Sequence, residues 1–116
     1  MNKILLAHTT QLEVEIRDAS AALVEALENL NESRKARDVA KRDYDEAASE
    51  TLAGMTKADG AEDMRKAKCR STHALKYADL WASETTLKDA ETALQIAQEK
   101  RYMLKDILTL WGGALQ

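Results

Sequence analysis

The fold of this chain is decided by residues 3–52, KILLAHTTQLEVEIRDASAALVEALENLNESRKARDVAKRDYDEAASETL, which contain neither proline nor glycine. Apolar side chains recur in this stretch, mostly at alternating steps of four and three residues, at Leu5, Leu12, Ile16, Ala19, Leu23, Ala26 and Leu30. This spacing places them on one stripe of an α-helix and is typical of a coiled-coil seam. We therefore predict one helix over about residues 3–53, roughly 75 Å long at ~1.5 Å per residue.

The seam changes character in the basic segment, residues 33–44, SRKARDVAKRDY. The same register there meets small and polar side chains, namely Ser33, Arg37, Ala40, Tyr44 and Ala47. A strong coiled-coil dimer would carry leucine at such positions. Either the helix leaves its partner in this segment, or the seam is built for close approach and a charged contact.

The remaining chain predicts a loop and a second long helix. The 116 residues include no proline, and the four glycines lie at positions 54, 60, 112 and 113, so helix-breaking residues are confined to two places. We predict a loop at 54–60, with Gly54 as a left-handed cap of the first helix. Asp59 is the candidate N-cap of a second helix over about 61–111, whose first turn carries Glu62 and Asp63.

The second helix has two differently patterned parts. The predicted inner face of its first part is dominated by small residues. It consists of Met64, Ala67, Ser71, Ala74 or Leu75, Ala78 and Trp81 or Ala82. The register then shifts at the SETT run, 83–86, where a break would create a third, C-terminal helix. From Leu87 a regular heptad follows through Ala90, Leu94, Ala97, Arg101, Leu104, Leu108 and Trp111. The predicted fold is all-α, a long antiparallel helical hairpin or coiled coil in one domain.

The C-terminal apolar stripe predicts packing, either within the hairpin or between subunits. An apolar fraction of 45 % without any phenylalanine cannot fill a thick core. Burial shared between chains would supply the missing core, so we expect a homo-oligomer. The predicted interface residues are Leu87, Leu94, Ala97, Leu104, Leu108 and Trp111.

Charge is segmented along the chain, although the net charge of −3 argues against a protein that coats nucleic acid through general basicity. Residues 1–32 carry six acidic side chains against Lys3 and Arg17, whereas residues 33–43 carry five basic side chains against two acidic ones. The first basic cluster consists of Arg34, Lys35, Arg37, Lys41 and Arg42, followed by Tyr44. The second consists of Arg65, Lys66, Lys68 and Arg70, near Lys76 and Tyr77.

These two clusters are the candidate nucleic-acid-binding residues. A track of cations binds phosphates, and a tyrosine offers a face for base stacking. At helical spacing, positions 34, 37 and 41 share one face, and 35 and 42 share another. The alternative is a solvated helix surface on which the first cluster pairs with nearby acids, Asp38, Asp43, Asp45 and Glu46.

Several function classes are not expected. A single cysteine, Cys69, excludes an internal disulfide, and with only His8 and His73 it forms no recognisable metal-ligand spacing. No catalytic motif, cofactor site or small-molecule site is predicted, so we expect no enzyme. The N-terminus MNKILLAHTT resembles neither a signal peptide nor a membrane span, and we expect a protein of the reducing cytoplasm.

Three features together resemble the UvsY-like recombination mediators of tailed phages. These are the basic helix ending in KRDY, the glycine-containing loop, and a helix that carries Tyr77, Trp81, Leu94, Ala97 and the run EKRYMLKDIL. The resemblance extends from about Lys41 to Trp111. It implies a small helical phage protein of the host cytoplasm that forms a ring-like oligomer, binds single-stranded DNA and loads a recombinase onto DNA covered by single-strand-binding protein.

The resemblance also implies site residues. The basic motif of the family corresponds to Lys41, Arg42, Asp43 and Tyr44, and its assembly helix corresponds to Leu94 through Leu110. The acidic heptad segment before Glu32 departs from the family pattern.

Two hypotheses of function follow. The first is a recombination mediator that binds single-stranded DNA and partner proteins. The second is a coiled-coil inhibitor or adaptor whose acidic N-terminal helix binds a basic protein surface, as a nucleic-acid mimic would, without binding DNA. A purely structural coiled-coil dimer is a third.

Overall fold

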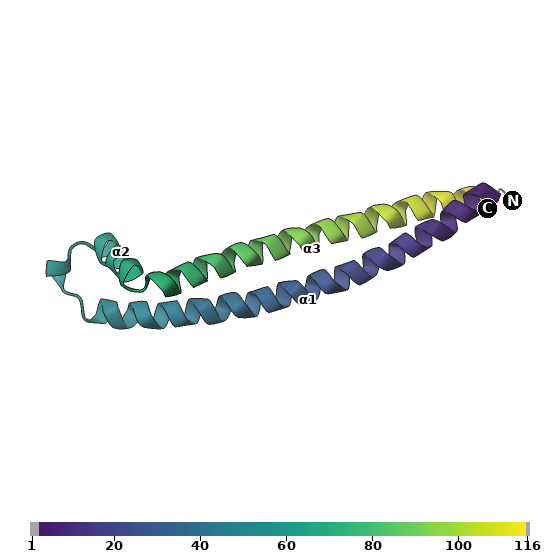
Figure 1. Ribbon diagram of the computed structural model, residues 1–116. Helices are drawn as coiled ribbons and strands as arrows, with labels where there is room; N and C mark the ends of the chain where they lie inside the picture. The colour runs from purple at the N-terminus through teal and green to yellow at the C-terminus, as the bar shows by residue number, and fades with distance from the viewer. Residues whose placement is uncertain (1–2, 116) are drawn as a thin grey trace. The chain divides into compact units, whose positions relative to one another are not determined.

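The computed structural model describes residues 3–115, without the side chains of Leu5 and residues 113–115. It contains α1 (Lys3–Ala53), the short 3-10 helix η1 (Lys57–Asp59), α2 (Glu62–Thr72) and α3 (Ala74–Leu115), as Figure 1 shows. No strand occurs among these residues. The all-α fold predicted from the sequence, a helical hairpin with coiled-coil packing, is therefore confirmed.

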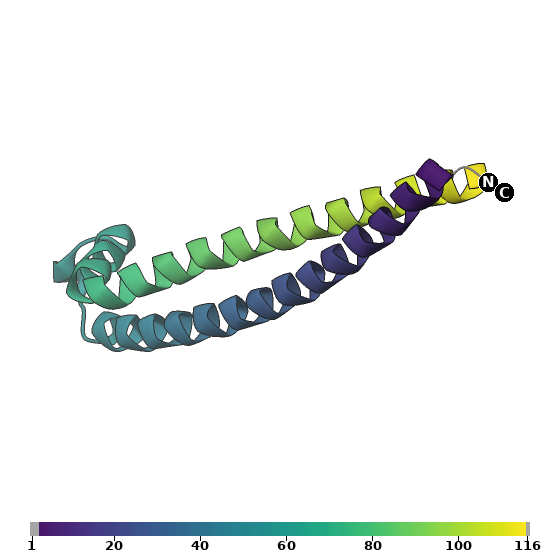
Figure 2. The same cartoon turned by 45° about the vertical axis from the view of Figure 1, so that its right-hand side comes forward.

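The chain divides into two packing units. Unit 1 takes its described residues from Met1–Asn31 and Asp89–Gln116, and unit 2 is Glu32–Lys88. Within unit 1, the N-terminal part of α1 and the C-terminal part of α3 lie side by side and run antiparallel (Figures 1 and 2). Arg101 Nε donates a hydrogen bond to Ser20 Oγ at 2.9 Å, and the rings of His8 and Trp111 meet edge to face at 5.9 Å. These two contacts join the N-terminal part of α1 to the C-terminal part of α3.

The core of unit 1 is the predicted seam. Leu12, Ala19 and Leu30 are 3–5 % exposed, and Ile16, Leu23 and Ala26 are half-buried. The predicted seam position Leu5 lies outside the described side chains. On α3 the heptad from Ala90 to Trp111 is half-buried, so its side chains pack inside the hairpin. The half-buried seam position 101 can hold an arginine because Ser20 Oγ accepts a hydrogen bond from its Nε.

Unit 2 continues the same seam with smaller residues. Ser33, Arg37, Ala40 and Tyr44 are half-buried, and Ala47 is 7 % exposed. The basic segment therefore remains packed, and the alternative in which the helix leaves its partner there is wrong. Small side chains allow this close packing because they occupy little volume between the helices.

The loop differs in detail from the sequence prediction. The helix α1 ends at Ala53, but Gly54 is not left-handed; among the described glycines only Gly60 has a positive φ, of 103°. Asp59 does not cap α2, whose N-cap is Ala61 without a side-chain hydrogen bond. The Asp59 carboxylate instead accepts from the Thr56 N–H at 2.8 Å and completes a capping box for η1. Acidic Glu62 and Asp63 do occupy the first turn of α2.

The helix break lies at His73, and α3 continues through Ser83–Thr86 without interruption. Hydroxyls of the SETT run bond back to the preceding turn of their own helix: Ser83 to Leu80 O at 2.7 Å, and Thr85 and Thr86 to carbonyls four residues earlier. They therefore do not cap a new helix. At this break, His73 Nε2 is hydrogen-bonded to Thr51 Oγ1 of α1 at 2.6 Å.

The face predicted for the first part of the second helix is wrong. The side chains turned inward are Arg65, Cys69, His73, Leu80, Ser83 and Leu87, whereas Met64 and Trp81 are 57 % and 64 % exposed. The heptad that contains Leu87 extends back through Ser83 and Leu80 in one register, so the predicted shift does not occur. At the other end α3 passes the predicted stop at 111 and ends at Leu115, because glycine weakens a helix without forbidding it.

Candidate nucleic-acid interface

The centre of the candidate site is a pair of tyrosines in unit 2. Tyr44 of α1 and Tyr77 of α3 have ring centroids 5.3 Å apart with planes inclined at 53°. The guanidinium carbon of Arg70 in α2 lies 5.9 Å from the centroid of the Tyr77 ring, within range of a cation–π interaction. Three helices thus bring the end of the first basic cluster against the end of the second.

A shallow pocket opens beside this pair. It has a volume of about 270 Å³ and is lined by Tyr44, Ala48, Leu52, Lys66, Arg70 and Tyr77. The Lys66 ammonium is 3.1 Å from the Glu62 carboxylate, whereas Arg70 has no acidic group within 4 Å among residues 3–115. Arg70 is therefore the cation of this pocket that a phosphate could engage without displacing an acid.

The first basic cluster is divided between two faces of α1. At 100° per residue, Arg34 and Lys41 flank the seam on the side of Ala48 and Leu52, whereas Lys35 and Arg42 point away from α3. These four side chains are exposed and have no acidic group within 4 Å in the described part of the chain. These four residues are thus solvent-exposed, as the solvated-surface alternative expects, but within residues 3–115 they lack the ion pairs with nearby acids that it also expects.

Other predicted site residues have contacts of their own. Arg37 is half-buried, with Nε 2.9 Å from the Asp38 carboxylate. Lys68 donates to the Asp59 carbonyl at 2.8 Å and so supports the loop. Arg65 is half-buried, and its Nε is a buried donor without a hydrogen-bond partner. The structure therefore separates Arg65 and Lys68 from the tyrosine pair, although all belong to one sequence cluster.

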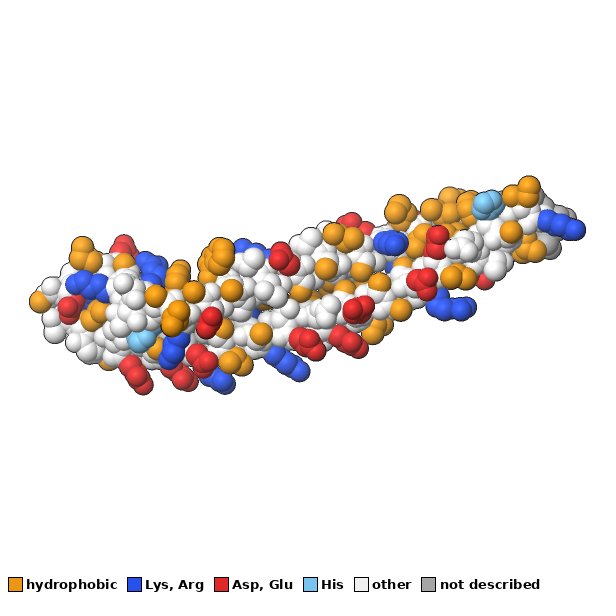
Figure 3. Space-filling model, viewed as in Figure 1, with side chains coloured by type: hydrophobic (Ala, Val, Ile, Leu, Met, Phe, Trp, Pro, Cys, Tyr) orange, Lys and Arg blue, Asp and Glu red, His pale blue; other side chains and the backbone are white. Residues whose placement is uncertain are grey.

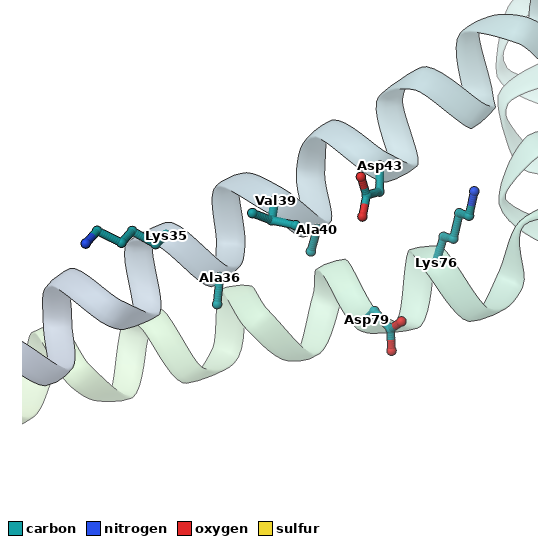
Figure 4. A pocket seen from close by; sticks show the side chains of 7 residues that line it. All are labelled: Lys35, Ala36, Val39, Ala40, Asp43, Lys76 and Asp79. Carbon is teal, nitrogen blue, oxygen red and sulfur yellow. The ribbon is translucent and has the colours of Figure 1, made fainter.

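The opposite side of unit 2 has a groove of mixed charge. Figure 4 shows a groove of about 480 Å³ lined by Lys35, Ala36, Val39, Ala40, Asp43, Lys76 and Asp79. The side chains of Asp43 and Lys76 point into this groove from facing helices, whereas Lys35 points away from them. Helical spacing puts Glu46 and Glu50 on the same face of α1 as Asp43. The groove thus carries two lysines against two aspartates. The side with the tyrosine pair has the cations Arg34, Lys41 and Arg70, which are unpaired within the described chain, and it is the candidate phosphate-binding surface.

Sequence reasoning missed the tyrosine pair and the exposed Trp81. Tyr44 and Tyr77 are almost equally distant along the chain from Gly60, and Gly60 is the turn residue of the hairpin. Residues equally distant from the turn of a hairpin face each other, so this spacing could have predicted the contact between Tyr44 and Tyr77. Trp81, one helical turn beyond Tyr77, adds a second exposed aromatic ring to α3.

The environment of Tyr44 predicts a pH effect. Burial raises the pKa of the Tyr44 phenol above its ordinary value of 10.0, with further upward contributions led by Cys69, while Arg70 acts in the opposite direction. The folded state therefore holds this proton more tightly than the unfolded state does. The resulting stabilisation is complete below pH 10 and is lost as the pH rises through the folded-state pKa.

We expect the free energy of unfolding of the wild type to fall more steeply above pH 10 than that of Tyr44→Phe. Urea denaturation of both proteins at several alkaline pH values measures this difference, because all other groups titrate in both. Two curves that run parallel between pH 8 and the alkaline limit would contradict the raised pKa.

The residues predicted for an oligomer interface pack between the helices of the same chain. Leu87 is 7 % exposed in unit 2, and Leu94, Ala97, Leu104, Leu108 and Trp111 are half-buried in unit 1. Among residues 3–115, no group of three or more His, Cys, Asp or Glu side chains could hold a metal ion. In the same part of the chain, none of the helices is long and apolar enough to cross a membrane.

The site is thus a cationic and aromatic surface on one side of unit 2, with a groove of mixed charge on the other side. Its function has to be argued from this geometry. Comparisons with protein-family models, with curated proteins and with solved structures found no match to this chain.

Proposed function

We propose that this protein is a non-enzymatic single-stranded-DNA-binding protein, and that the strand lies on the side of unit 2 that carries the Tyr44–Tyr77 pair. The observation that carries the proposal is the contact of this pair with Arg70, 5.9 Å from the Tyr77 centroid. Aromatic rings next to unpaired cations match the two parts of a nucleotide, its base and its phosphate.

Single-stranded nucleic acid is favoured over duplex for a physical reason. Trp81, which is 64 % exposed, and the solvent-facing part of Tyr77 offer stacking surfaces, and only an unpaired base can stack on them. Arg34 and Lys41 are seven residues apart, about 10 Å along the helix, so they can contact separate phosphates of one strand. On the other side, Lys35 and Lys76 share a groove with Asp43 and Asp79, so the cations without neighbouring acids favour the face of the tyrosine pair.

The recombination-mediator role is part of the same proposal. The resemblance to UvsY-like mediators covers the helix with Lys41 and Tyr44 and also α3. In that role the protein acts in the cytoplasm of a phage-infected host as a homo-oligomer, holding single-stranded DNA while a recombinase replaces single-strand-binding protein.

A second candidate is a protein-binding adaptor or inhibitor that acts through unit 1. By sequence, unit 1 has nine acidic residues against five basic ones, whereas unit 2 has eleven against twelve. The acids of its α1 arm, Glu13, Glu15, Asp18, Glu25 and Glu28, are all exposed, and none is within 4 Å of a basic group in the described residues. Such a surface suits a basic protein partner.

Titration with labelled single-stranded DNA distinguishes the two candidates. We expect binding of an oligothymidine of about 30 nucleotides at ~50 mM salt, and affinity at least about tenfold weaker at ~200 mM, because each phosphate contact releases a counterion. Fluorescence anisotropy measures both, with duplex of the same length as the comparison. Absence of binding at low salt would reject the DNA proposal and leave the adaptor.

A further inference from the structure

A second apolar stripe runs along α3 in unit 1, outside the seam that packs on α1. It steps by three and four residues through Ala93, Ile96, Lys100, Met103, Ile107 and Leu110. Ile96, Met103 and Leu110 are 60 %, 57 % and 73 % exposed, and Leu110 is the most exposed large apolar side chain among the described residues of unit 1. Figure 3 shows hydrophobic side chains gathered on the surface of this part of α3. We call these six residues the outer stripe.

The spacing of the outer stripe is that of a coiled-coil seam without a partner. Isolated apolar residues on a protein surface need no explanation, but exposed apolar residues at heptad spacing over about two and a half heptads do. The seam heptad from Leu94 to Trp111 already serves the contact with α1, because its residues are half-buried. Five of the six residues of the outer stripe are exposed and Ile107 is half-buried, so most of the stripe is free to meet another helix.

We propose that the outer stripe is the dimer interface of this protein, and that its occupant is the outer stripe of a second copy running antiparallel. In this arrangement Ala93 meets Leu110 of the other copy, Ile96 meets Ile107, and Lys100 meets Met103. Each contact occurs twice, so the surface is self-complementary, as a two-fold interface requires. Small Ala93 opposite large Leu110 keeps the helix spacing even.

The charges at Lys100 and Asp106 favour a second copy of this chain as the partner and an antiparallel orientation of the two α3 helices. In a parallel pair, Lys100 would face Lys100 at the centre of the interface and the two charges would repel. In the antiparallel pair, Lys100 packs its stem on Met103 and its ammonium reaches Asp106 of the other copy, one turn away. Lys100 and Asp106 are exposed and have no ion pair within 4 Å in the described chain, so both are available.

The neighbourhood of Lys100 sets the design of the test. Lys100 also borders a groove with Glu15 and Asp18 of α1, although neither carboxylate is within 4 Å of it. A single charge reversal at Lys100 would therefore disturb its own subunit as well. Reversing Lys100 and Asp106 together restores the pairing between copies and isolates their contribution.

Sedimentation equilibrium between about 5 and 300 µM tests the dimer. We expect the wild type to dimerise, Met103→Glu and Asp106→Lys to raise the dissociation constant at least about tenfold, and Lys100→Asp/Asp106→Lys to recover most of that loss. The matched control, Val24→Glu, alters another exposed apolar residue of unit 1 and should leave the dimer unchanged. A monomer at the highest concentration, or a dimer indifferent to Met103→Glu, would overturn the proposal.

Oxidative cross-linking tests the orientation. In a Cys69→Ser background, we expect a mixture of Ile96→Cys and Ile107→Cys chains to form a disulfide. Ile96→Cys alone should not, because the two cysteines would lie about 16 Å apart along the antiparallel helices. Self-cross-linking of Ile96→Cys would show a parallel pair and reject the proposed arrangement. The result does not depend on DNA binding, which is measured separately.

Discussion

Leu30→Ala is expected to lower the free energy of unfolding by about 2–4 kcal/mol. The Leu30 side chain is 3 % exposed, the lowest value among the seam leucines whose side chains the structure describes. Removing it leaves a cavity between two helices that have no second layer of side chains behind them. The urea midpoint of unfolding, followed by circular dichroism at 222 nm, measures the loss.

Leu75→Ala is the matched control for this experiment. It makes the same chemical change in a helix, but Leu75 is 83 % exposed in the folded protein. The substitution therefore removes very little buried apolar surface. Leucine and alanine have similar helix propensities, and the expected change is within about 0.5 kcal/mol. If the two variants lost equal stability, the seam around Leu30 would not be the core of the protein.

The packing of the long helices was predictable because one physical rule governs it. A helix with a proline-free heptad buries the residues that repeat every 3.5 positions, and Leu12, Ala19 and Leu30 do so here. The polar positions of the basic segment follow the same rule, since Arg37 and Tyr44 are half-buried at their predicted places. Hydrophobic spacing alone was sufficient for α1 and for the second half of α3.

The region between the long helices could not be predicted in the same way. The helix break lies at His73, whose ring is hydrogen-bonded to Thr51, 22 residues away along the chain. Local helix propensity gives no information about such a long-range contact. The SETT run has the composition of a helix start, but its hydroxyls find acceptors within the preceding turn of α3. The alanines of α2 and early α3 also gave no contrast between an inner and an outer face.

The candidate site was predictable only in part. Helical phase placed positions 34, 37 and 41 on one face and 35 and 42 on another, and α1 is unbroken over all five. It did not distinguish Arg37, which is half-buried and paired with Asp38, from the exposed Arg34 and Lys41. The roles of Lys68 and Asp59 could not be read from the sequence, since they depend on the loop path that brings them together. For the same reason Arg70 did not stand out from its cluster until the structure put it over Tyr77.

This helical phase gives the sharpest test of the proposed DNA surface. Arg34→Glu/Lys41→Glu is expected to weaken binding of single-stranded DNA on the order of 100-fold at low salt, because two phosphate contacts become repulsions. The slope of the logarithm of affinity against the logarithm of salt concentration should also become shallower, by roughly 0.7 for each lost phosphate contact. Anisotropy titrations with labelled oligothymidine at several salt concentrations give both quantities.

Lys35→Glu/Arg42→Glu is the matched control, because each mutated residue lies one position further along α1 and the net charge changes equally. These side chains point away from α3 and from the tyrosine pair, so only the general electrostatic field changes. We expect a loss of about tenfold or less, together with a salt slope close to that of the wild type. Equal losses in both double variants would mean that the DNA senses the net charge of α1 rather than the face next to Tyr44, Tyr77 and Arg70.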